Sequence, residues 1–529
     1  MLRTCIPPKM PFRYGTGAFV LLAVFLVWTV VKSKLKKRRN NAKAAALGCL
    51  PPPEIRSTNL IGNSILRESM KATKEDRGPQ YVMEKMDGVS PGCHTIKVPI
   101  IDYEIVVTRD PENARVLFSS PDFDISHTRQ LSWMPLLGKG IFTSRGETWK
   151  HSRALLRPQF AREMISDPQL EEHHLQNLWG RLAADPGTGG WTDTVDLAPL
   201  FFKFTLDTAT EFIFGTSTNS LRQGDGDEEK KEKKKDLSGH FNAAKVWIDK
   251  RGALAKFYWL MNSREFKEHC ATIHEFADGL VADRLAHPPE KSGADPEKGG
   301  RFNLLNELAK ETQDPRELRN ETLHVLIAGR DTTGCLLGWV VYFLARHPAV
   351  FQKLRGLILE RFGDNPADFR SLNQVPYLQW IINETLRVVT VIPLNERIAL
   401  RDTVLPRGGG PDGKSRVFIP EGTQVLIPLY AMQHRKDIWG EDVEEFRPER
   451  WESHRPGWEF IPFGAGARKC LGQQFGRQEV SYVISRFCQK YDRIENMEQG
   501  ENRIRLHHAI ENRSGTGVQV RLHEAKAAS

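Results

Sequence analysis

The chain has 529 residues, 40% of them hydrophobic, and a formal net charge of +9. Its length allows one very large domain or a few ordinary ones, and its composition can fill a sizeable globular core. The seven cysteines lie far apart and never form a CxxC pair, which argues against a disulfide framework and against a zinc site. The positive charge would suit a nucleic acid, a membrane surface or an acidic partner, and charge alone does not choose among them.

An apolar run without charged residues extends from Tyr14 to Val31, close to the roughly 20 residues of a membrane helix. A cleaved signal peptide is the alternative, favoured by basic residues before the run and by the small residues Ala44 to Ala46 after it. The basic cluster from Lys32 to Arg39 is typical of a stop-transfer sequence and favours a retained anchor with a cytosolic body. We therefore expect a short non-cytosolic N-terminus (1–13), a transmembrane anchor (14–31), a basic and proline-rich linker (32–53) and one large body (54–529).

The body is expected to be mainly α-helical with small β-sheets. Strand signals are confined to segments such as Ile100 to Val107, and to the pair Arg416 to Ile419 and Gln424 to Pro428, which Pro420-Glu421-Gly422 joins. Before the body, Leu50-Pro51-Pro52-Pro53 predicts a stiff extended spacer that would hold it at a set angle to a bilayer.

Two charged stretches interrupt the helical pattern, from Gly224 to Asp236 and from His287 to Arg301. We interpret both as surface insertions, and a docking tail is the alternative for the first. The sequence contains no internal repeat, no phosphate-binding GxxxxGK[ST] loop and no basic-aromatic pattern typical of nucleic-acid binding. A nucleic-acid partner is therefore not expected.

The most specific motif lies around Cys470, in the string Phe463-Gly464-Ala465-Gly466-Ala467-Arg468-Lys469-Cys470-Leu471-Gly472. It follows a strand-like Phe460-Ile461-Pro462 and precedes a helix-like run from Gln473 to Phe487. If the cysteine binds iron, the two early glycines allow a tight turn beneath a flat macrocycle, and backbone N–H groups at the helix start stabilise its thiolate. Arg468 can reach a haem propionate.

Two other interpretations of this segment are a buried structural cysteine and part of a dinucleotide-binding loop. Lys469 occupies the place of the third glycine of a dinucleotide loop, so the nucleotide interpretation fails. The segment resembles the haem-binding signature of the cytochrome P-450 family. The resemblance implies the cytochrome P-450 fold, haem b as cofactor and Cys470 as its axial ligand, with Phe463, Gly464, Gly466 and Arg468 in the cofactor-binding loop.

A second motif, Ala328-Gly329-Arg330-Asp331-Thr332-Thr333, lies within an apolar run from Leu323 to Leu344 that predicts a central helix. A glycine and two threonines are poor helix formers, and such a local conflict is expected at a functional site. The alternative is a threonine bonded to its own helix with the aspartate facing solvent. By resemblance to the family's oxygen-activating helix, Asp331 and Thr332 are the expected catalytic acid and alcohol.

Glu384-Thr385-Leu386-Arg387 places opposite charges at i and i+3 on one helix face, which alone would be an ordinary surface pair. In the family this pair is buried and joined by an arginine from a later segment, here Arg450, and it holds the fold around the thiolate loop. Trp149 and Arg153 stand at i and i+4, where a surface arginine on a half-buried tryptophan is the alternative. The resemblance implies that they contact the haem propionates, with Arg397 as a less certain third contact.

The family's five motifs occur here in the family's order: Trp149 with Arg153, Ala328 to Thr333, Glu384 with Arg387, Arg450, and Cys470. The resemblance covers nearly everything after Pro51. The haem would supply oxygen chemistry at an unactivated C–H bond, and the thiolate would favour O–O cleavage. No flavin or nicotinamide motif is found, so the resemblance implies O2 as co-substrate and a separate, membrane-bound NADPH-dependent flavoprotein reductase as electron donor. Fungal and animal members resemble this chain in having one N-terminal membrane helix, which implies the endoplasmic reticulum membrane.

Four strings resemble the yeast and filamentous-fungal n-alkane and fatty-acid hydroxylases. They are Leu137 to Phe142, Trp149 to Phe160, Leu405 to Gly413 and Arg435 to Gly440. This resemblance implies hydroxylation at the terminal carbon of a long aliphatic chain. Glu396 stands where an apolar residue is expected in that branch. If its side chain faces the access channel, the preference between acids and alkanes stays open. The alternative is that Glu396 points away from the channel and pairs with a basic neighbour.

Three other functions stay open at this point. The first is a monooxygenase for another lipophilic compound, such as a secondary metabolite or xenobiotic. The second is a haem-thiolate isomerase or dehydratase, which would not need the acid-alcohol pair that Asp331 and Thr332 supply. The third is a non-catalytic haem sensor, which would need neither that pair nor a reductase.

Overall fold

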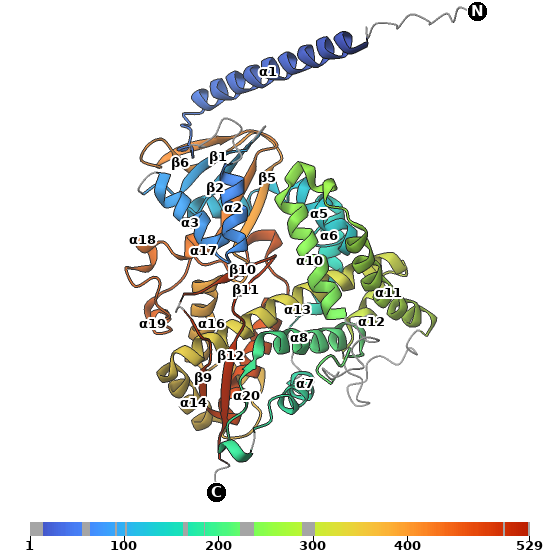
Figure 1. The fold of residues 1–529 in the computed structure, drawn as a ribbon, viewed down its shortest axis with the longest axis vertical. Helices are drawn as coiled ribbons and strands as arrows, with labels where there is room; N and C mark the ends of the chain where they lie inside the picture. The colour runs from blue at the N-terminus through green and yellow to red at the C-terminus, as the bar shows by residue number, and fades with distance from the viewer. Residues whose placement is uncertain are drawn as a thin grey trace, which may run out of the picture.

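The computed structural model describes residues 14–55, 64–89, 92–100, 103–161, 168–184, 186–222, 237–287, 302–500 and 503–526. Helices make up most of it, and this confirms the mainly α fold with small β-sheets (Figure 1). The expected segment 1–13 and most of the two charged insertions lie outside the described residues. The α-helices are α1 (Tyr14–Ala46), α2 (Ser64–Lys74), α3 (Gly78–Val89), α4 (Pro111–Ser119), α5 (His127–Leu137), α6 (Gly146–Leu156), α7 (Pro168–Gly180), α8 (Leu197–Phe214), α10 (Leu237–Ala253), α11 (Arg264–Ala286), α12 (Leu304–Glu311), α13 (Pro315–Arg346), α14 (Pro348–Phe362), α15 (Phe369–Leu372), α16 (Pro376–Val389), α17 (Leu429–Gln433), α18 (Lys436–Trp439), α19 (Arg450–Ser453) and α20 (Gln473–Lys490).

The strands form four small sheets. The largest has the order β1-β2-β8-β5-β3, a second has the order β4-β12-β9, and β6-β7 and β10-β11 are two-stranded. The strands are β1 (Thr95–Ile100), β2 (Tyr103–Thr108), β3 (Phe123–Asp124), β4 (Val195–Asp196), β5 (Leu394–Ala399), β6 (Thr403–Gly409), β7 (Ser415–Ile419), β8 (Gln424–Pro428), β9 (Tyr491–Asn496), β10 (Leu506–His508), β11 (Asn512–Ser514) and β12 (Gln519–Glu524).

The two strands expected to lie together around Pro420-Glu421-Gly422 are both present, as β7 and β8, but they do not pair with each other. Strand β8 is bonded on one edge to β2 and on the other to β5, so it has no free edge for β7. Strand β7 pairs with β6 instead. Neighbours in sequence therefore belong to different sheets.

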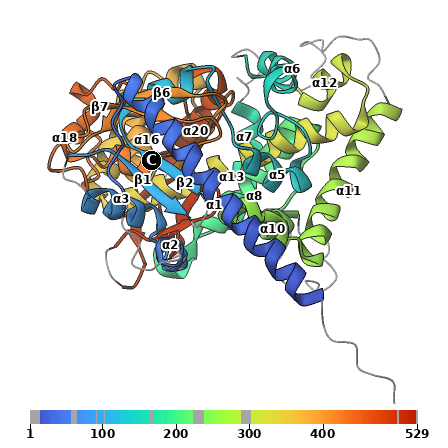
Figure 2. The ribbon, with the colours of Figure 1, turned by 90° about the horizontal axis from the view of Figure 1, so that it is seen from above.

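Helix α13 is the central element, as its apolar run predicts. Asp314 caps its N-terminus by accepting a hydrogen bond from the backbone N–H of Arg316, and Pro315 occupies the first turn. Nearly every residue from Leu318 to Ala345 is buried, so neighbours surround the helix on all faces. Figure 2 shows the strand-rich part on one side of α13 and helices α5, α10 and α11 on the other.

Helix α1 extends away from the body beside β1 and β6 (Figure 1). The linker expected from residue 32 is helical as far as Ala46, because this segment is rich in Lys and Ala and contains no Gly or Pro. Among the residues that the structure describes, no single helix has both the length and the apolarity of a membrane span. Within the same described part of the chain, the bent pair α13 and α14, which meet at 110°, reaches both measures by length and composition.

The last turn of α1 and the segment that follows it are both bonded to the body. Lys43 Nζ lies 2.5 Å from the Asp402 carboxylate, and the Leu50 N–H donates to the Arg416 carbonyl at 2.9 Å. Pro53 and Ile55 flank a short bridge to Lys97 of β1, with N···O distances of 2.8 and 3.0 Å. The proline spacer is thus a strap on the β1 and β7 edges.

Candidate functional site

Cys470 lies in a tight loop immediately before α20. Its backbone N–H donates to the Phe463 carbonyl at 3.0 Å, and the Gly464 N–H donates to the Ile461 carbonyl at 2.9 Å. Both Gly464 and Gly466 have positive φ, 65° and 64°, as the turn requires. Cys470 is exposed, whereas the other described cysteines are buried: Cys49, Cys93, Cys270, Cys335 and Cys488. The loop therefore presents one sulfur.

Opposing effects act on the Cys470 thiol. Protein atoms surround it at longer range although its own surface is exposed, and this desolvation raises the pKa of Cys470. A hydrogen bond from the Gly472 N–H and the positive charges of Arg153 and Lys469 lower the same pKa by smaller amounts. The start of α20 thus supplies the N–H donor that favours a thiolate ligand.

The structure brings Trp149, Arg153 and Arg468 together beside this loop. The Arg468 guanidinium lies 4.4 Å from the centre of the Trp149 ring, and its Nη2 is 2.7 Å from Asp124 Oδ1. Arg153 Nη2 donates to the Lys469 carbonyl at 3.0 Å, next to the cysteine. Helix α6 therefore reaches the loop through its tryptophan and arginine.

Arg397 approaches from strand β5. Its Nη1 donates to the Glu396 carbonyl at 2.8 Å and to Asn395 Oδ1 at 3.0 Å, while its guanidinium lies 4.5 Å from the Phe118 ring centre. Burial and, to a smaller extent, the charges of Arg129 and Arg468 lower the pKa of Arg397 to about 10, although Glu396 acts in the opposite direction. Arg397 is therefore one of four neighbouring arginines, the cationic cluster, which also contains Arg129, Arg145 and Arg468.

Two members of this group, Arg129 of α5 and Arg145 before α6, were missed in the sequence. Arg129 Nε and Arg145 Nε and Nη2 are buried without hydrogen-bond partners among the described residues. The charged groups that act on one another here are Arg129, Arg145, Arg397, Arg468, Asp124 and Glu396. Four guanidinium groups against two carboxylates leave a positive excess and unused donors, which fit the two propionates of a haem.

On α13, Asp331 and Thr332 occupy different surroundings. Thr332 Oγ1 donates to the Ala328 carbonyl at 2.7 Å, so the threonine is bonded to its own helix. Asp331 is only 2% exposed and does not face solvent. Its Oδ1 lies 3.1 Å from Lys245 Nζ, whereas its Oδ2 is buried and has no hydrogen-bond partner within the described chain. One carboxylate oxygen is thus held and the other is available.

Glu384 and Arg387 of α16 form a buried pair, both 0% exposed. Arg387 Nε and Nη2 each lie 2.9 Å from a different oxygen of Glu384. Arg450 Nε reaches the same carboxylate at 3.3 Å, and the Trp451 indole N–H donates to it at 3.0 Å. The three expected residues therefore meet, and Trp451 is a further donor that the motif did not indicate.

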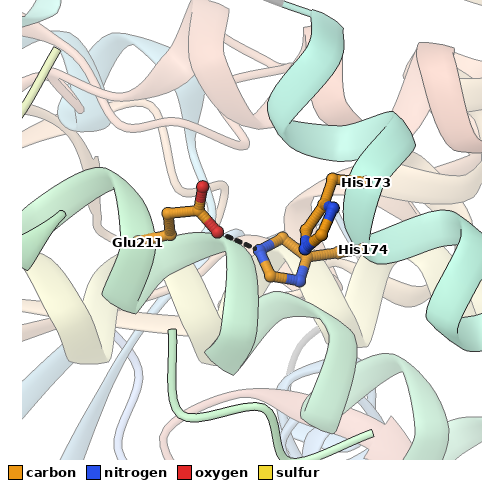
Figure 3. Close-up of side chains that lie close together, drawn as sticks. All are labelled: His173, His174 and Glu211. Atoms are coloured by element: carbon orange, nitrogen blue, oxygen red, sulfur yellow. Dashed lines mark hydrogen bonds and ion pairs between the residues drawn. The ribbon is translucent and has the colours of Figure 1, made fainter. Parts of the chain in front are cut away.

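A second cluster of potential metal ligands lies on α7 and α8, away from the cysteine loop. It consists of His173, His174 and Glu211 (Figure 3). His174 Nε2 is 2.8 Å from Glu211 Oε2, and burial lowers the pKa of His174. The hydrogen bond between the two helices accounts for this arrangement without an ion.

A family model described as Cytochrome P450 matches residues 94–511, which include every motif above. The chain belongs to the cytochrome P450 family. Cytochrome P450 monooxygenase g430 of Fusarium sp is 39% identical over 502 residues, covering 93% of this chain and 88% of that protein. Cytochrome P450 52A13 of Debaryomyces hansenii is 37% identical over 494 residues, covering 91% and 93%. Cytochrome P450 52A5 of Candida maltosa is 39% identical over 447 residues, covering 81% and 83%.

Membership confirms the resemblance and makes this chain a P450 monooxygenase with a haem-thiolate cofactor. The residues present fit that group: an exposed cysteine in a glycine turn, and a cationic cluster with unused donors beside it. When bound, the haem supplies the oxygen activation, and its electrons come from a reductase, as P450 enzymes generally require. Cys470 would hold its iron, and Arg129, Arg145, Arg153, Arg397 and Arg468 would hold its propionates.

Proposed function

We propose that this P450 hydroxylates the terminal carbon of long-chain fatty acids or n-alkanes. It uses O2 and electrons that a membrane-bound flavoprotein reductase takes from NADPH. The observation that carries the proposal is the set of four strings that resemble those of the fungal alkane and fatty-acid hydroxylases, above all Leu137 to Phe142. The yeast 52A relatives, which match most of the chain at 36–39% identity, support placement in this part of the family.

The string from Leu137 to Phe142 packs tightly on α13. A Cβ on Gly138 would lie 2.3 Å from Asn320 Oδ1, and one on Gly140 would lie 2.3 Å from the His324 ring. The Ile141 carbonyl accepts a hydrogen bond from Arg468 at 3.4 Å. Because this loop contacts both α13 and the cationic cluster, its shape bears directly on the site.

The helices over this side of α13 share an apolar cluster. It includes Leu136 of α5, Phe241 of α10, Phe266 of α11 and Leu326 of α13. These four side chains are fully buried in the core, so they show that this side of α13 is apolar. An apolar interior suits an aliphatic chain, which has no polar group along its length to bind. It also suits other lipophilic compounds, which stay as the alternative substrate class.

Glu396 bears on the choice between acids and alkanes. Its Oε1 accepts a hydrogen bond from the Ser126 N–H at 2.8 Å, and its charge acts on Arg129 and Arg397. This carboxylate is thus engaged with the backbone and with the cationic cluster. We therefore propose that Glu396 does not exclude a fatty acid.

We also propose a single-pass anchor at residues 14–31 in the endoplasmic reticulum membrane, with the catalytic body in the cytosol. The uncharged run from Tyr14 to Val31 and the basic residues that follow it support this topology. The exposed, apolar side chains of Leu21, Val24 and Val27 on α1 also support it. An aliphatic substrate dissolves in the same bilayer.

The test uses purified full-length protein with a fungal NADPH-dependent P450 reductase. Hexadecanoic acid and hexadecane are offered separately, and products are located by mass spectrometry. A terminal alcohol, or the acid formed from it, is expected from at least one substrate, and the variant Cys470→Ser should give none. An intact reduced carbon monoxide complex without product from either substrate would overturn the aliphatic assignment. Oxygen-dependent NADPH consumption separates a monooxygenase from an isomerase or a sensor.

A further inference from the structure

Lys245 of α10 is a buried lysine that connects three separate elements. Its side chain is 2% exposed, and its Nζ lies 3.1 Å from Asp331 Oδ1 on α13 and 2.6 Å from Glu511 Oε1 between β10 and β11. The two carboxylates are themselves only 2% and 1% exposed. One ammonium group therefore pairs with two buried carboxylates from different parts of the chain.

Arg330 makes the reverse connection, from α13 to the first turns of α10. It is 0% exposed and pairs with Asp331 at 2.5 Å. Its Nη1 also donates to Asn242 Oδ1 at 3.2 Å, and its Nη2 donates to the Ser238 hydroxyl. Helix α10 is thus fastened to α13 twice, by Lys245 at Asp331 and by Arg330 at Ser238 and Asn242.

Glu511 is a fixed point because the next residue is bonded to the core. Asn512 Nδ2 donates to the carbonyls of Val389 and Thr390 at 3.0 and 3.2 Å, and the Asn512 carbonyl accepts the Trp339 indole N–H at 2.7 Å. The Glu511 carboxylate is therefore held in place by its own backbone. Lys245, carried by α10, is the partner that would move if α10 moved.

Two buried cations, Lys245 and Arg330, face two buried carboxylates, Asp331 and Glu511, and the half-buried Arg513 adds a further positive charge near Glu511. Asp249, one turn after Lys245 on α10, adds little negative charge, because burial and the nearby Glu511 charge raise its pKa and favour its neutral form. Buried ions that lose one partner leave an uncompensated charge at high cost. Lifting α10 from α13 therefore separates charges that have no solvent to replace their partners.

We propose that Lys245 is a positioning residue that locks α10 onto α13 and onto the β10–β11 turn, so that α10 cannot lift without withdrawing the ammonium group that holds one oxygen of the Asp331 carboxylate. In this arrangement, closure of α10 over α13 and the orientation of the Asp331 carboxylate are one event. Lys245 acts through Asp331 and does not touch the substrate. The proposal does not depend on which compound the enzyme oxidises.

The first test measures hydrogen exchange of α10 amides in the haem-loaded, full-length protein. Lys245→Met should raise the exchange rate of residues 241–249 about tenfold or more, because local opening loses its ionic restraint. Glu511→Gln should raise it less, and Lys245→Arg should stay near the wild type. The matched control is Lys250→Met on the same helix, an exposed lysine 4.4 Å from the Trp247 ring centre. Equal exchange in Lys245→Met and Lys250→Met would overturn the lock.

The second test asks whether the lock positions Asp331. Hydrogen peroxide formation with reductase and NADPH, without substrate, is measured in H2O and in D2O. Lys245→Met should change the solvent isotope effect in the same direction as Asp331→Asn, and Lys250→Met and Lys245→Arg should not. A loosened α10 with a wild-type isotope effect would overturn the positioning role. If Lys245→Met fails to fold, both measurements are made on Glu511→Gln instead.

Discussion

Gly466 lies against the end of α4 so closely that a Cβ at this position would be 2.0 Å from the carbonyl oxygen of Phe118. A side chain there would meet backbone, which cannot rotate away. The turn that carries Cys470 therefore depends on this contact between two segments about 350 residues apart in the sequence. Gly464 has nearly the same φ but a distance of 3.8 Å to the Phe118 ring, so it has room for a methyl group.

The pair predicts different outcomes for two alanine variants. Gly464→Ala carries only the strain of a left-handed residue, about 1–2 kcal/mol, and should keep the reduced carbon monoxide spectrum of a thiolate ligand. Gly466→Ala adds the collision and should lose most of that spectrum. Equal spectra from the two variants would show that the loop yields to the methyl group.

Glu384 is predicted to be the most sensitive carboxylate for stability. Glu384→Gln should lower the free energy of unfolding by about 3–5 kcal/mol, because Arg387 would be left buried without its anion and Arg450 would keep only its pair with Asp442, at 3.1 Å. Denaturant unfolding measures the change. Glu452→Gln, an exposed residue of α19, is the control and should change the free energy by less than about 0.5 kcal/mol.

Arg145 is predicted to retain the haem. Arg145→Gln should speed haem transfer to an acceptor globin about tenfold or more, because a charged hydrogen bond to a propionate contributes about 1.5–3 kcal/mol. Arg157→Gln, an exposed arginine just after α6, should leave the rate unchanged. A rate for Arg145→Gln equal to that of this control would place the unused donors elsewhere than on the propionates.

Thr332 is predicted to control how NADPH is used. Thr332→Val should lower product formed per NADPH about tenfold and raise hydrogen peroxide, because it removes the hydroxyl that is expected to deliver protons together with Asp331. Thr332→Ser keeps the hydroxyl and should stay within about threefold of the wild type. Unchanged coupling in the valine variant would remove Thr332 from proton delivery.

Glu479 predicts a dependence of stability on pH. Burial raises the pKa of Glu479 from its ordinary 4.5 to about 7, although the Thr208 hydroxyl donates to it at 2.8 Å. The folded state then holds a proton that the unfolded state has lost, so stability falls as the pH rises from about 4.5 to about 7. Glu479→Gln should flatten this fall and be up to about 3 kcal/mol more stable than the wild type at pH 8.

Glu321 provides the reference for that measurement, since burial raises its pKa to about 7 as well. Denaturant titrations at several pH values should therefore show that the free energy of unfolding falls less steeply with pH in Glu479→Gln than in the wild type. The fall that remains is the contribution of Glu321. A slope equal to that of the wild type would mean that Glu479 titrates alike in the folded and unfolded states.

The sequence predicted those features whose residues lie close together in a motif. The Cys470 loop, helix α13 and the Glu384–Arg387 pair are of this kind, because short-range spacing places their residues together. The burial of the Glu384–Arg387 pair and the role of the Cys470 loop came from the family resemblance. Strands β7 and β8 were identified, but not their partners, since pairing depends on which edges β2 and β5 occupy.

Residues that act through long-range contacts gave no signal in the sequence. Arg129 and Arg145 are single arginines outside any motif, and only the packing of α5 and α6 reveals that they face Arg397 and Arg468. Lys245 and Glu511 are 266 positions apart, and each looks like an ordinary surface charge until α10 and the β10–β11 turn meet. All four residues have their structural roles because they are buried, and the residues next to them in the sequence do not indicate this burial.

The strap between α1 and the body sets a practical limit on shortening the protein. Cys49 and Ile55 are buried, and the Leu50 N–H and the Pro53 carbonyl are bonded to β7 and β1, so these residues behave as part of the catalytic body. A soluble version should therefore begin near Ala46 and keep the whole strap. One that begins at residue 56 would expose the β1 edge to pairing with other molecules and invite aggregation.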